Sequence, residues 1–118
     1  MSRIDPVPPK YGEVWLVESR DEESAPDLWP AVVISSDAME QMPLRLVAKI
    51  KNFQKGSGLW CVEVPQEKSS GLDQPAVVDA MQICSIETGR CRKRLGRLPA
   101  DCMVEVAAAV AILVEHEW

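Results

Sequence analysis

Residues 30–35 read Pro30-Ala31-Val32-Val33-Ile34-Ser35, and this apolar run is the stretch that decides the fold. A short, continuous apolar run is typical of a β-strand that is buried on both of its faces, and proline is tolerated at the first position of a strand. The run therefore predicts a strand in the interior of a sheet, with further strands on each side of it.

Other apolar runs recur at regular intervals before and after this strand. They cover residues 13–17, 44–50, 59–64 and 76–83, and segments rich in Gly, Pro and Asp separate them. The stretch Lys55-Gly56-Ser57-Gly58 predicts a hairpin turn. About five short strands joined in this way indicate a small barrel or sandwich and argue against an alternating α/β fold.

The C-terminal part of the chain has the periodicity of a helix, predicted from about residue 99 to residue 116. Pro99 suits a first helical turn, and Asp101 complements the positive end of the helix dipole. The helix is apolar on two sides, so we expect one face to pack on the sheet and the other to be buried in a partner subunit. The first face comprises Met103, Val106, Ala107, Val110, Leu113 and Val114, and the second Val104, Ala108, Ala111 and Ile112.

Length and composition bound the class of protein. The chain has 118 residues, of which 47% are hydrophobic and 26% charged, so we expect one domain over residues 11–118 after an extended, proline-containing arm at residues 1–10. The arm lacks the apolar core of a secretory signal. The longest apolar run, residues 102–114, is shorter than the roughly 18 residues that a membrane span requires. These features predict a soluble, cytoplasmic protein.

The residues that usually hold metals or form disulfides are sparse. The four cysteines are Cys61, Cys84, Cys91 and Cys102, and none of them forms a Cys-x-x-Cys pair. His116 is the one histidine, so a zinc site or a histidine-dependent catalytic triad is not expected. The acidic run at residues 21–23 is interpreted as a solvated loop. Reduced thiols are the main interpretation, and a Cys84–Cys91 bridge remains the alternative.

Charge is distributed unevenly along the chain. The net charge is −5, yet residues 41–98 carry ten basic and five acidic residues, while residues 1–40 carry three basic and nine acidic ones. A basic middle segment in an acidic chain is compatible with one face that binds a polyanion. The alternative is a pair of solvated faces with no ligand.

Several segments together resemble a known family. In sequence order they are Tyr11-Gly12-Glu13-Val14-Trp15-Leu16-Val17, the run at residues 30–35, Leu46-Val47-Ala48-Lys49-Ile50 and Arg94-Leu95-Gly96-Arg97-Leu98, followed by the apolar helix. Their order and spacing are similar to those of the MazF/PemK toxins of type II toxin–antitoxin systems. The resemblance covers nearly the whole chain from about residue 11.

The resemblance implies a fold and an activity. The fold is mainly β with a C-terminal helix, a small SH3-like barrel of the MazF/PemK (CcdB-like) type that forms a homodimer. The activity is that of an mRNA interferase, a metal-independent endoribonuclease that cleaves single-stranded RNA without a cofactor. The 2′-hydroxyl attacks the adjacent phosphorus and expels the 5′-oxygen, which requires a proton carrier and a cation near the phosphorane. The implied partner is a small antitoxin protein.

The sequence departs from the family pattern at the positions that carry this chemistry. Trp29 stands where the family has an arginine, and Lys51 where it has a threonine. Met81 stands in place of the aspartate of an Asp-Gln-Ile motif. The loop at residues 18–28 is about two residues short and carries five acids. Lys51 and Trp29 are therefore the candidate catalytic positions, and whether the protein is an enzyme stays open.

Residues near these positions are candidates for RNA contacts, because lysines hold phosphates and aromatic rings stack on bases. The RNA-binding candidates are Lys49, Asn52, Phe53, Lys55 and Gln82, and Trp29 is also a candidate stacking platform. The alternative for Lys49 and Lys51 is a pair of solvated strand lysines. Trp60 is either a stacking residue or, more simply, part of the core. The basic run at residues 90–94 either contacts phosphate or is a solvated turn before the helix.

Two functions follow from these observations. The first is a toxin-family endoribonuclease that retains cleavage through a rearranged site. The second is a catalytically silent dimeric module that binds nucleic acid or an antitoxin-like peptide in the same groove. If a cognate antitoxin exists, the acidic loop at residues 18–28 predicts that its docking segment is less acidic or more apolar than is usual for the family.

Overall fold

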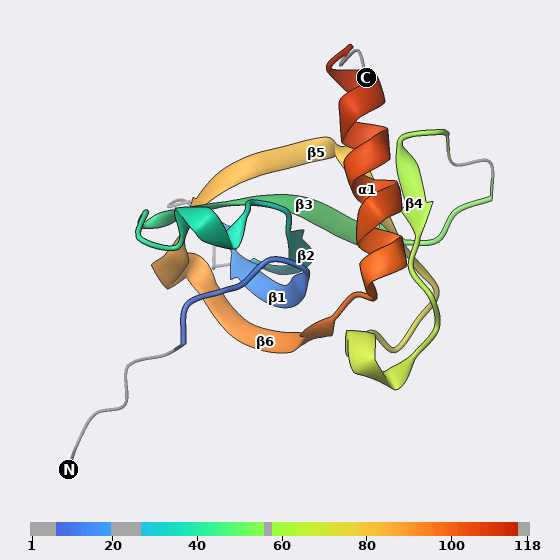
Figure 1. Ribbon diagram of the computed structural model, residues 1–118. Helices are drawn as coiled ribbons and strands as arrows, with labels where there is room; N and C mark the ends of the chain where they lie inside the picture. Colours follow the sequence, from blue (N-terminus) through green and yellow to red (C-terminus); the bar gives the residue numbers. More distant parts are fainter. Residues whose placement is uncertain (1–6, 20–26, 56–57, 116–118) are drawn as a thin grey trace.

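The computed structural model describes residues 7–19, 27–55 and 58–115, and Figure 1 shows their arrangement. The strands are β1 (Glu13–Glu18), β2 (Leu28–Val33), β3 (Leu44–Asn52), β4 (Cys61–Glu63), β5 (Ala76–Glu87) and β6 (Cys91–Arg97). Three short 3-10 helices, η1 (Asp37–Met39), η2 (Lys68–Ser70) and η3 (Thr88–Arg90), join some of them. The chain then forms one α-helix, α1 (Ala100–Leu113).

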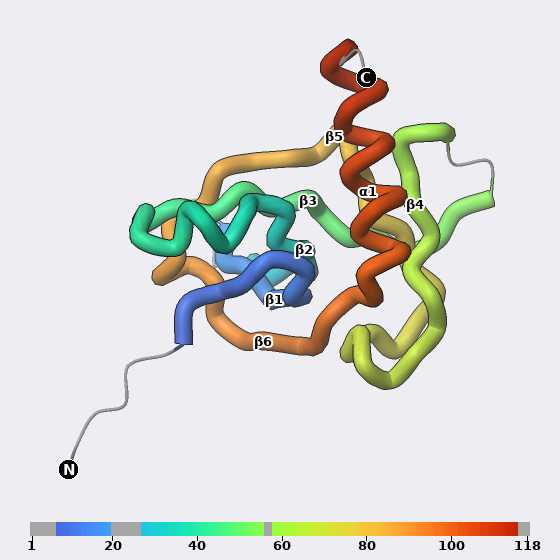
Figure 2. The backbone as a smooth tube through the Cα atoms, in the orientation of Figure 1, coloured from blue at the N-terminus to red at the C-terminus, as the bar shows by residue number. Residues whose placement is uncertain are grey.

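All six strands belong to one antiparallel sheet with the order β4-β5-β3-β2-β1-β6. The sheet curves strongly, but β4 and β6 remain its two ends and no ladder joins them within the described residues. The predicted class, mainly β with a C-terminal helix, is confirmed. The barrel is an open one. The trace in Figure 2 shows how β6 leads directly into α1 at the foot of the helix.

The apolar run at residues 30–35 is buried on both faces, as its sequence predicts. Val32 packs in one hydrophobic cluster, while its neighbours Ala31 and Val33 pack in another on the opposite side of the strand. All three side chains are fully buried. A buried valine stabilises a fold by about 1.5–3 kcal/mol relative to an exposed one. The alternation of side chains along a strand therefore lets one run of residues supply both clusters.

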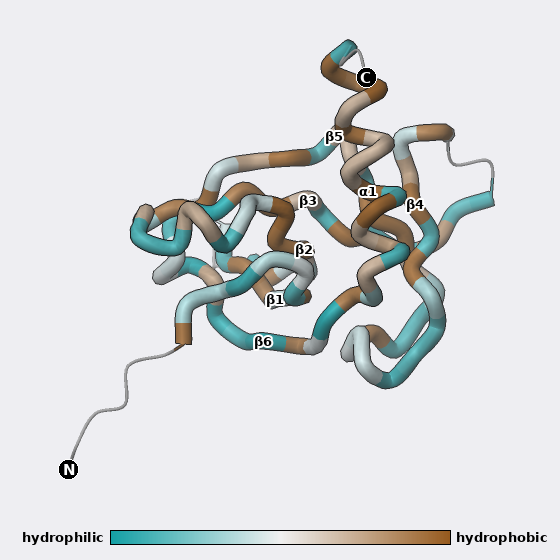
Figure 3. Tube along the Cα trace, in the orientation of Figure 1, coloured by the Kyte–Doolittle hydropathy of each residue, from teal (hydrophilic) through white to brown (hydrophobic). Residues whose placement is uncertain are grey.

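Helix α1 covers the first of these clusters. It begins at Ala100, with Pro99 as the extended residue before it and not in the first helical turn as predicted, and it carries Asp101 in its first turn, as predicted. Its buried residues are Cys102, Met103, Val106 and Ala109. Leu113 and Val114, which the periodicity placed on the packed face, are exposed instead, because the end of the helix extends beyond the sheet. Figure 3 shows hydrophobic residues along the helix up to this end.

Strand β6 is absent from the sequence-based prediction, which treated residues 90–94 as a phosphate contact or a solvated turn. The residues of β6 are mostly hydrophilic, as the colouring of the trace in Figure 3 shows, so a search for apolar runs does not find the strand. The strand is held by pairing with β1 and by two cross-strand ion pairs, Arg94 Nε with Glu13 Oε2 at 2.7 Å and Arg92 Nε with Glu18 Oε2 at 3.7 Å. Opposite charges on neighbouring strands replace hydrophobic pairing here.

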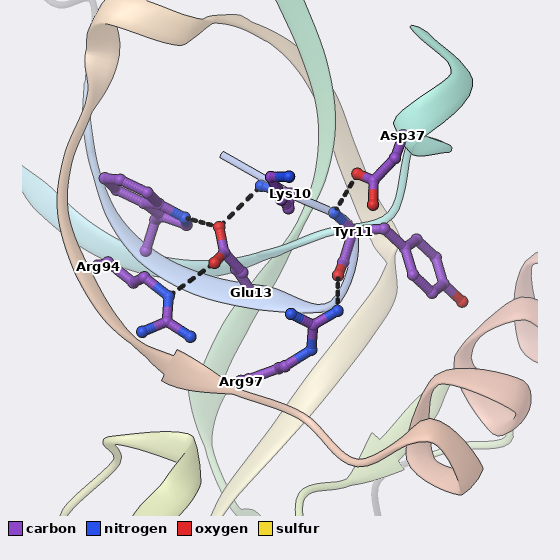
Figure 4. A network of polar contacts seen from close by, with 7 residues as sticks. Lys10, Tyr11, Glu13, Asp37, Arg94 and Arg97 are labelled. Carbon is purple, nitrogen blue, oxygen red and sulfur yellow. Dashed lines mark hydrogen bonds and ion pairs between the residues drawn. The ribbon is translucent and has the colours of Figure 1, made fainter. Parts of the chain in front are cut away.

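Glu13 is the centre of a polar network that fixes the start of β1 (Figure 4). Its carboxylate accepts hydrogen bonds from the Lys10 amide at 2.8 Å, from Trp15 Nε1 at 3.2 Å and from Arg94 Nε at 2.7 Å. Asp37 accepts from the Tyr11 amide at 2.8 Å. These bonds satisfy a largely buried carboxylate and tie the first residues of the domain to β6 and η1.

Some predicted features lie outside the described residues. These are residues 1–6 of the arm, residues 20–26 of the acidic loop, the Gly56-Ser57 centre of the predicted turn, and His116 at the predicted end of the helix. The four cysteines are free thiols, so Cys84 and Cys91 are not bridged. In the part of the chain that the structure describes, no helix has the length and apolarity needed to cross a membrane.

Gly96 is expected to be required for the contact between β6 and η2. A Cβ atom at Gly96 would lie 2.2 Å from the carbonyl oxygen of Ser69, whereas a Cβ at Gly89 meets nothing within 4 Å. Gly96→Ala should therefore lower the free energy of unfolding by about 1–3 kcal/mol, and Gly89→Ala by less than about 0.5 kcal/mol. Urea unfolding of both variants measures this, and equal stabilities would contradict the close contact.

Candidate functional site

A bulge in β5 creates the centre of the candidate site. On β3, Ala48 pairs with Ile83, but the next residue, Lys49, pairs with Asp79. The three residues between Asp79 and Ile83 therefore have no partner on β3. Bulges of this kind re-aim side chains and are common next to functional sites. Here the bulge places the carboxylate of Asp79 beside β3.

Asp79 is buried, with 4% of its side chain exposed, and three donors satisfy it. Lys51 Nζ and Gln82 Nε2 each lie 2.9 Å from its Oδ2 atom. The Met81 amide donates to Oδ1, also at 2.9 Å. The carboxylate is thus bound to β3 and to both sides of the bulge, which fixes Lys51 and Gln82 relative to each other.

The ion pair shifts the pKa values of both partners. Burial disfavours the charged form of Asp79, but the hydrogen bonds from Lys51, Gln82 and the Met81 amide outweigh it, so the pKa of this carboxyl lies below its usual value. The hydrogen bond to Asp79 raises the pKa of Lys51 against a smaller opposing effect of burial. Both groups are therefore ionised at neutral pH, and Lys51 is a permanent cation rather than a base.

Lys49 and Trp29 form a second contact close to this pair. Lys49 is two residues from Lys51 on β3, and its Nζ atom lies 5.8 Å from the centroid of the Trp29 ring. A cation at this distance is attracted by the indole face. A lysine of β3 thus lies over the face of the Trp29 indole.

The arginines among the described residues bind to groups other than Trp29. Arg45 donates to backbone carbonyls that include that of Pro9, and Arg90 donates to the Glu18 carbonyl. Arg92 and Arg94 pair with acids of β1, and Arg97 donates to the Tyr11 carbonyl. Among residues 7–19, 27–55 and 58–115, the cation recorded at the Trp29 ring is therefore a lysine, Lys49.

Both lysines line a groove of about 560 Å³ that is formed by residues of five strands and of the segment before β5. The groove brings together residues from five parts of the chain, including Leu16, Pro30, Lys49, Lys51, Asn52, Asp73, Gln74 and Leu95. Its walls combine apolar side chains with polar and cationic ones. A space of this size and composition can hold part of a flexible anionic chain.

The structure brings only some of the predicted residues to this groove. Lys49, Lys51 and Asn52 line it, and Gln82 is linked to it through Asp79. Phe53 faces a separate hollow of about 440 Å³ with Pro65 and Pro75. Lys55 is exposed and does not line the groove. Trp60 is 43% exposed, so its interpretation as plain core is wrong.

Asp79 is the residue that sequence reasoning missed. The prediction placed the family's aspartate at position 81, where Met81 stands, but the bulge lets a carboxylate two residues earlier reach Gln82. One signal was available, because Asp79 is the sole charged residue in the apolar run 76–83. A single acidic residue in a strand that is buried on both faces needs an ion pair or hydrogen-bond donors to offset the cost of burying its charge. In the described residues, no group of three or more His, Cys, Asp or Glu side chains is placed to hold a metal ion.

Asp79→Asn is expected to remove a pH-dependent part of the stability. Because folding lowers the pKa of Asp79, its ion pair stabilises the fold above the unfolded pKa of about 4 and is lost as the pH falls through the lower, folded pKa. At pH 7 the variant should be less stable by about 1–3 kcal/mol, and its stability should fall less steeply between pH 5 and pH 3. Urea unfolding followed by tryptophan fluorescence measures both, with Asp73→Asn as the control. If the stability of wild type and of Asp79→Asn depended on pH in the same way, the stabilising role of the Asp79 ion pair would be contradicted.

Comparison with known proteins places the chain among bacterial toxins. The model of the PemK-like, MazF-like toxin of type II toxin–antitoxin systems matches residues 10–114. The comparison with curated proteins finds no significant match. Among solved structures, a MazE-MazF complex from Deinococcus radiodurans is similar, with a TM-score of 0.80 and 21% identity over 95% of this chain and 100% of that one.

Two mycobacterial structures have the same fold. One is an endoribonuclease in complex with its cognate antitoxin, with a TM-score of 0.75 and 16% identity over 93% of this chain and 98% of that one. The other is the Mycobacterium tuberculosis toxin MazF-mt6, with a TM-score of 0.74 and 18% identity over 90% and 99% of the two chains. The fold agrees over nearly the full length, and the family model covers most of the sequence. The chain therefore belongs to the PemK-like, MazF-like toxin family of type II toxin–antitoxin systems.

Proposed function

We propose that this protein is a metal-independent endoribonuclease that binds single-stranded RNA in the groove lined by Lys49 and Lys51 and cleaves it slowly. The observation that carries the proposal is the ammonium group of Lys51, which lines the groove, is 34% exposed and is held by a buried carboxylate. A positioned cation beside a bound phosphate stabilises the charge that develops when the phosphorus becomes pentavalent. Lys49 supplies a second positive charge on the same strand.

The reaction follows from these positions. The 2′-hydroxyl loses its proton to water and attacks the adjacent phosphorus, the bond from phosphorus to the 5′-oxygen breaks, and this oxygen takes up a proton. The products are a 2′,3′-cyclic phosphate and a 5′-hydroxyl end. Lys51 acts through its charge, since its raised pKa keeps it protonated. Trp29 transfers no proton, and a missing acid–base group costs roughly 10²–10⁴-fold in rate.

A second function, a catalytically silent module that binds nucleic acid or an antitoxin-like peptide, is favoured by one observation. Asp79 neutralises Lys51, and Lys49 lies over Trp29, so each groove lysine is already engaged within the chain. A phosphate has to compete with these contacts. If Lys51 stays paired with Asp79 when RNA is bound, no free charge stabilises the pentavalent phosphorus, and the protein binds RNA without cleaving it.

The double variant Trp29→Arg with Lys51→Thr separates the two functions. It restores the residue types of the family at both positions without a change in net charge, and should raise the cleavage rate of long single-stranded RNA in EDTA by at least tenfold over a slow wild type. Denaturing gels and detection of 2′,3′-cyclic phosphate ends measure the rate.

The matched control is Trp60→Arg with Lys68→Thr, which makes the same substitutions at positions that neither line the groove nor contact Lys49, and it should leave the rate unchanged. RNA that stays intact with the wild type but is cut by the double variant would favour the silent module. RNA that stays intact with both proteins, under every buffer tried, would rule out the endoribonuclease.

We also propose that the protein acts in the cytoplasm as a homodimer regulated by an antitoxin. The end of α1 supports the homodimer, because Val114 is 67% exposed and lies at a hollow lined by Tyr11, Ile34, Val110 and other apolar residues. An apolar patch of this kind on a helix favours a protein partner. The proposal of an antitoxin is based on family membership. It predicts that the protein co-purifies with the product of the neighbouring reading frame.

Val114→Asp is expected to convert a dimer into a folded monomer, because it places a charge in the buried centre of the proposed contact. Light scattering at micromolar concentration measures the mass, and circular dichroism checks the fold. Leu59→Asp changes a more exposed residue away from the helix and should leave the mass unaltered. A wild type that is monomeric at these concentrations would contradict the homodimer.

A further inference from the structure

A second hollow begins where the candidate groove ends on β3. Asn52 lines the groove, and the next residue, Phe53, lines the hollow of about 440 Å³. The same change occurs on the segment before β5, where Gln74 lines the groove and Pro75 the hollow, and Ala76 lines both spaces. Consecutive Cα atoms lie about 3.8 Å apart, so the groove gives way to the hollow over a very short distance. A ligand that fills the groove therefore has the hollow directly beside it.

The backbone holds the walls of this hollow in place. The Phe53 amide donates to the Pro75 carbonyl at 2.9 Å, and the Val64 amide donates to the Ala76 carbonyl, also at 2.9 Å. The rings of Pro65 and Pro75 fix the φ angles of two further wall residues. A hollow whose walls are already ordered loses little conformational freedom when a ligand enters it, and this favours binding.

The side chains of the hollow suit a flat, uncharged ring and not a phosphate. Phe53 is 44% exposed, and the exposed rings of Pro65 and Pro75 line the same space. Nucleobases stack on aromatic rings of this kind. Glu63 is the one charged residue that lines the hollow, and its negative charge repels a phosphate. A bound nucleic-acid strand would therefore keep its phosphates at the two groove lysines and turn a base into the hollow.

We propose that the hollow lined by Phe53, Pro65 and Pro75 is a second subsite, which binds the base of a nucleotide whose neighbour lies in the groove, with the Phe53 ring stacked on that base. This inference rests on the proposed binding of single-stranded RNA and extends its binding site. Every base has a face that can stack, so the subsite raises affinity without selecting a sequence. Bases inside a duplex stack on one another, so their faces cannot meet the Phe53 ring, and the subsite favours single strands.

The test compares two ligands that carry the same phosphates and differ in their bases. One is an octamer of 2′-O-methyluridine, which lacks the free 2′-hydroxyl and is not cleaved. The other is an abasic octamer, in which tetrahydrofuran replaces each nucleoside. Fluorescence anisotropy at fixed salt gives both Kd values. Phe53→Ala should weaken binding of the uridine octamer by at least about fivefold, the lower end of the range for base–aromatic stacking, and leave the Kd of the abasic octamer unchanged.

Further variants separate stacking from other effects, and circular dichroism checks that each of them is folded. Phe53→Leu keeps an apolar side chain without the ring and should also weaken the uridine octamer alone, so it tests the subsite if Phe53→Ala does not fold. Phe53→Tyr keeps a ring and should bind both octamers as the wild type does. Lys49→Ala removes a groove cation and should weaken both octamers. Met39→Ala changes a residue that is 49% exposed and lines neither space, and it should change neither Kd.

The outcomes distinguish this inference from the proposed function. If the folded Phe53 variants without a ring lost affinity for both octamers equally, or for neither, Phe53 would not stack on a base. Either result would overturn the second subsite and leave RNA binding in the groove in place. Failure of the wild type to bind the uridine octamer or any longer single-stranded RNA would overturn the proposed function, and the inference with it.

Discussion

A single buried carboxylate organises the candidate site. Asp79 lies in a strand whose neighbours are almost entirely buried apolar residues, and a charge in such surroundings is costly unless donors surround it. The bulge in β5, the ammonium of Lys51 and the amide of Gln82 together meet this requirement. Lys51 and Gln82 thus take their positions because they donate to one charged group that is buried inside the sheet.

The same interaction fixes the position of Lys51. A free lysine carries a compact charge at the end of a long, flexible side chain, so the position of the charge is not fixed. Here the ion pair with Asp79 restrains the ammonium at the groove wall. Trp29 has a comparable relation to Lys49, whose charge lies over the indole face. Each of the two lysines of β3 at the candidate site is therefore held by a neighbouring side chain.

The sequence predicted the parts of the fold that depend on hydrophobic pattern, and missed those that depend on charge. The run at residues 30–35 indicated a strand buried on both faces, and Val32 between Ala31 and Val33 confirms it. Strand β6 was not predicted, because ion pairs of Arg92 and Arg94 with acids of β1 hold it in the sheet. Such pairs cannot be recognised before the register of the two strands is known. Asp79 escaped for a related reason, since a bulge changes which residues share a face and leaves no mark in the periodicity.

The cationic character of β6 bears on how copies of the protein meet. This strand is the last of the sheet, and its outer edge offers backbone donors and acceptors to any strand that approaches it. Two such edges from separate molecules would bring Arg92, Lys93 and Arg94 of each against the other, and like charges at that spacing repel. The C-terminal end of α1, by contrast, exposes the apolar residues Ile112, Leu113 and Val114. The fold therefore discourages fibre-like sheet extension while it leaves helix-mediated association open.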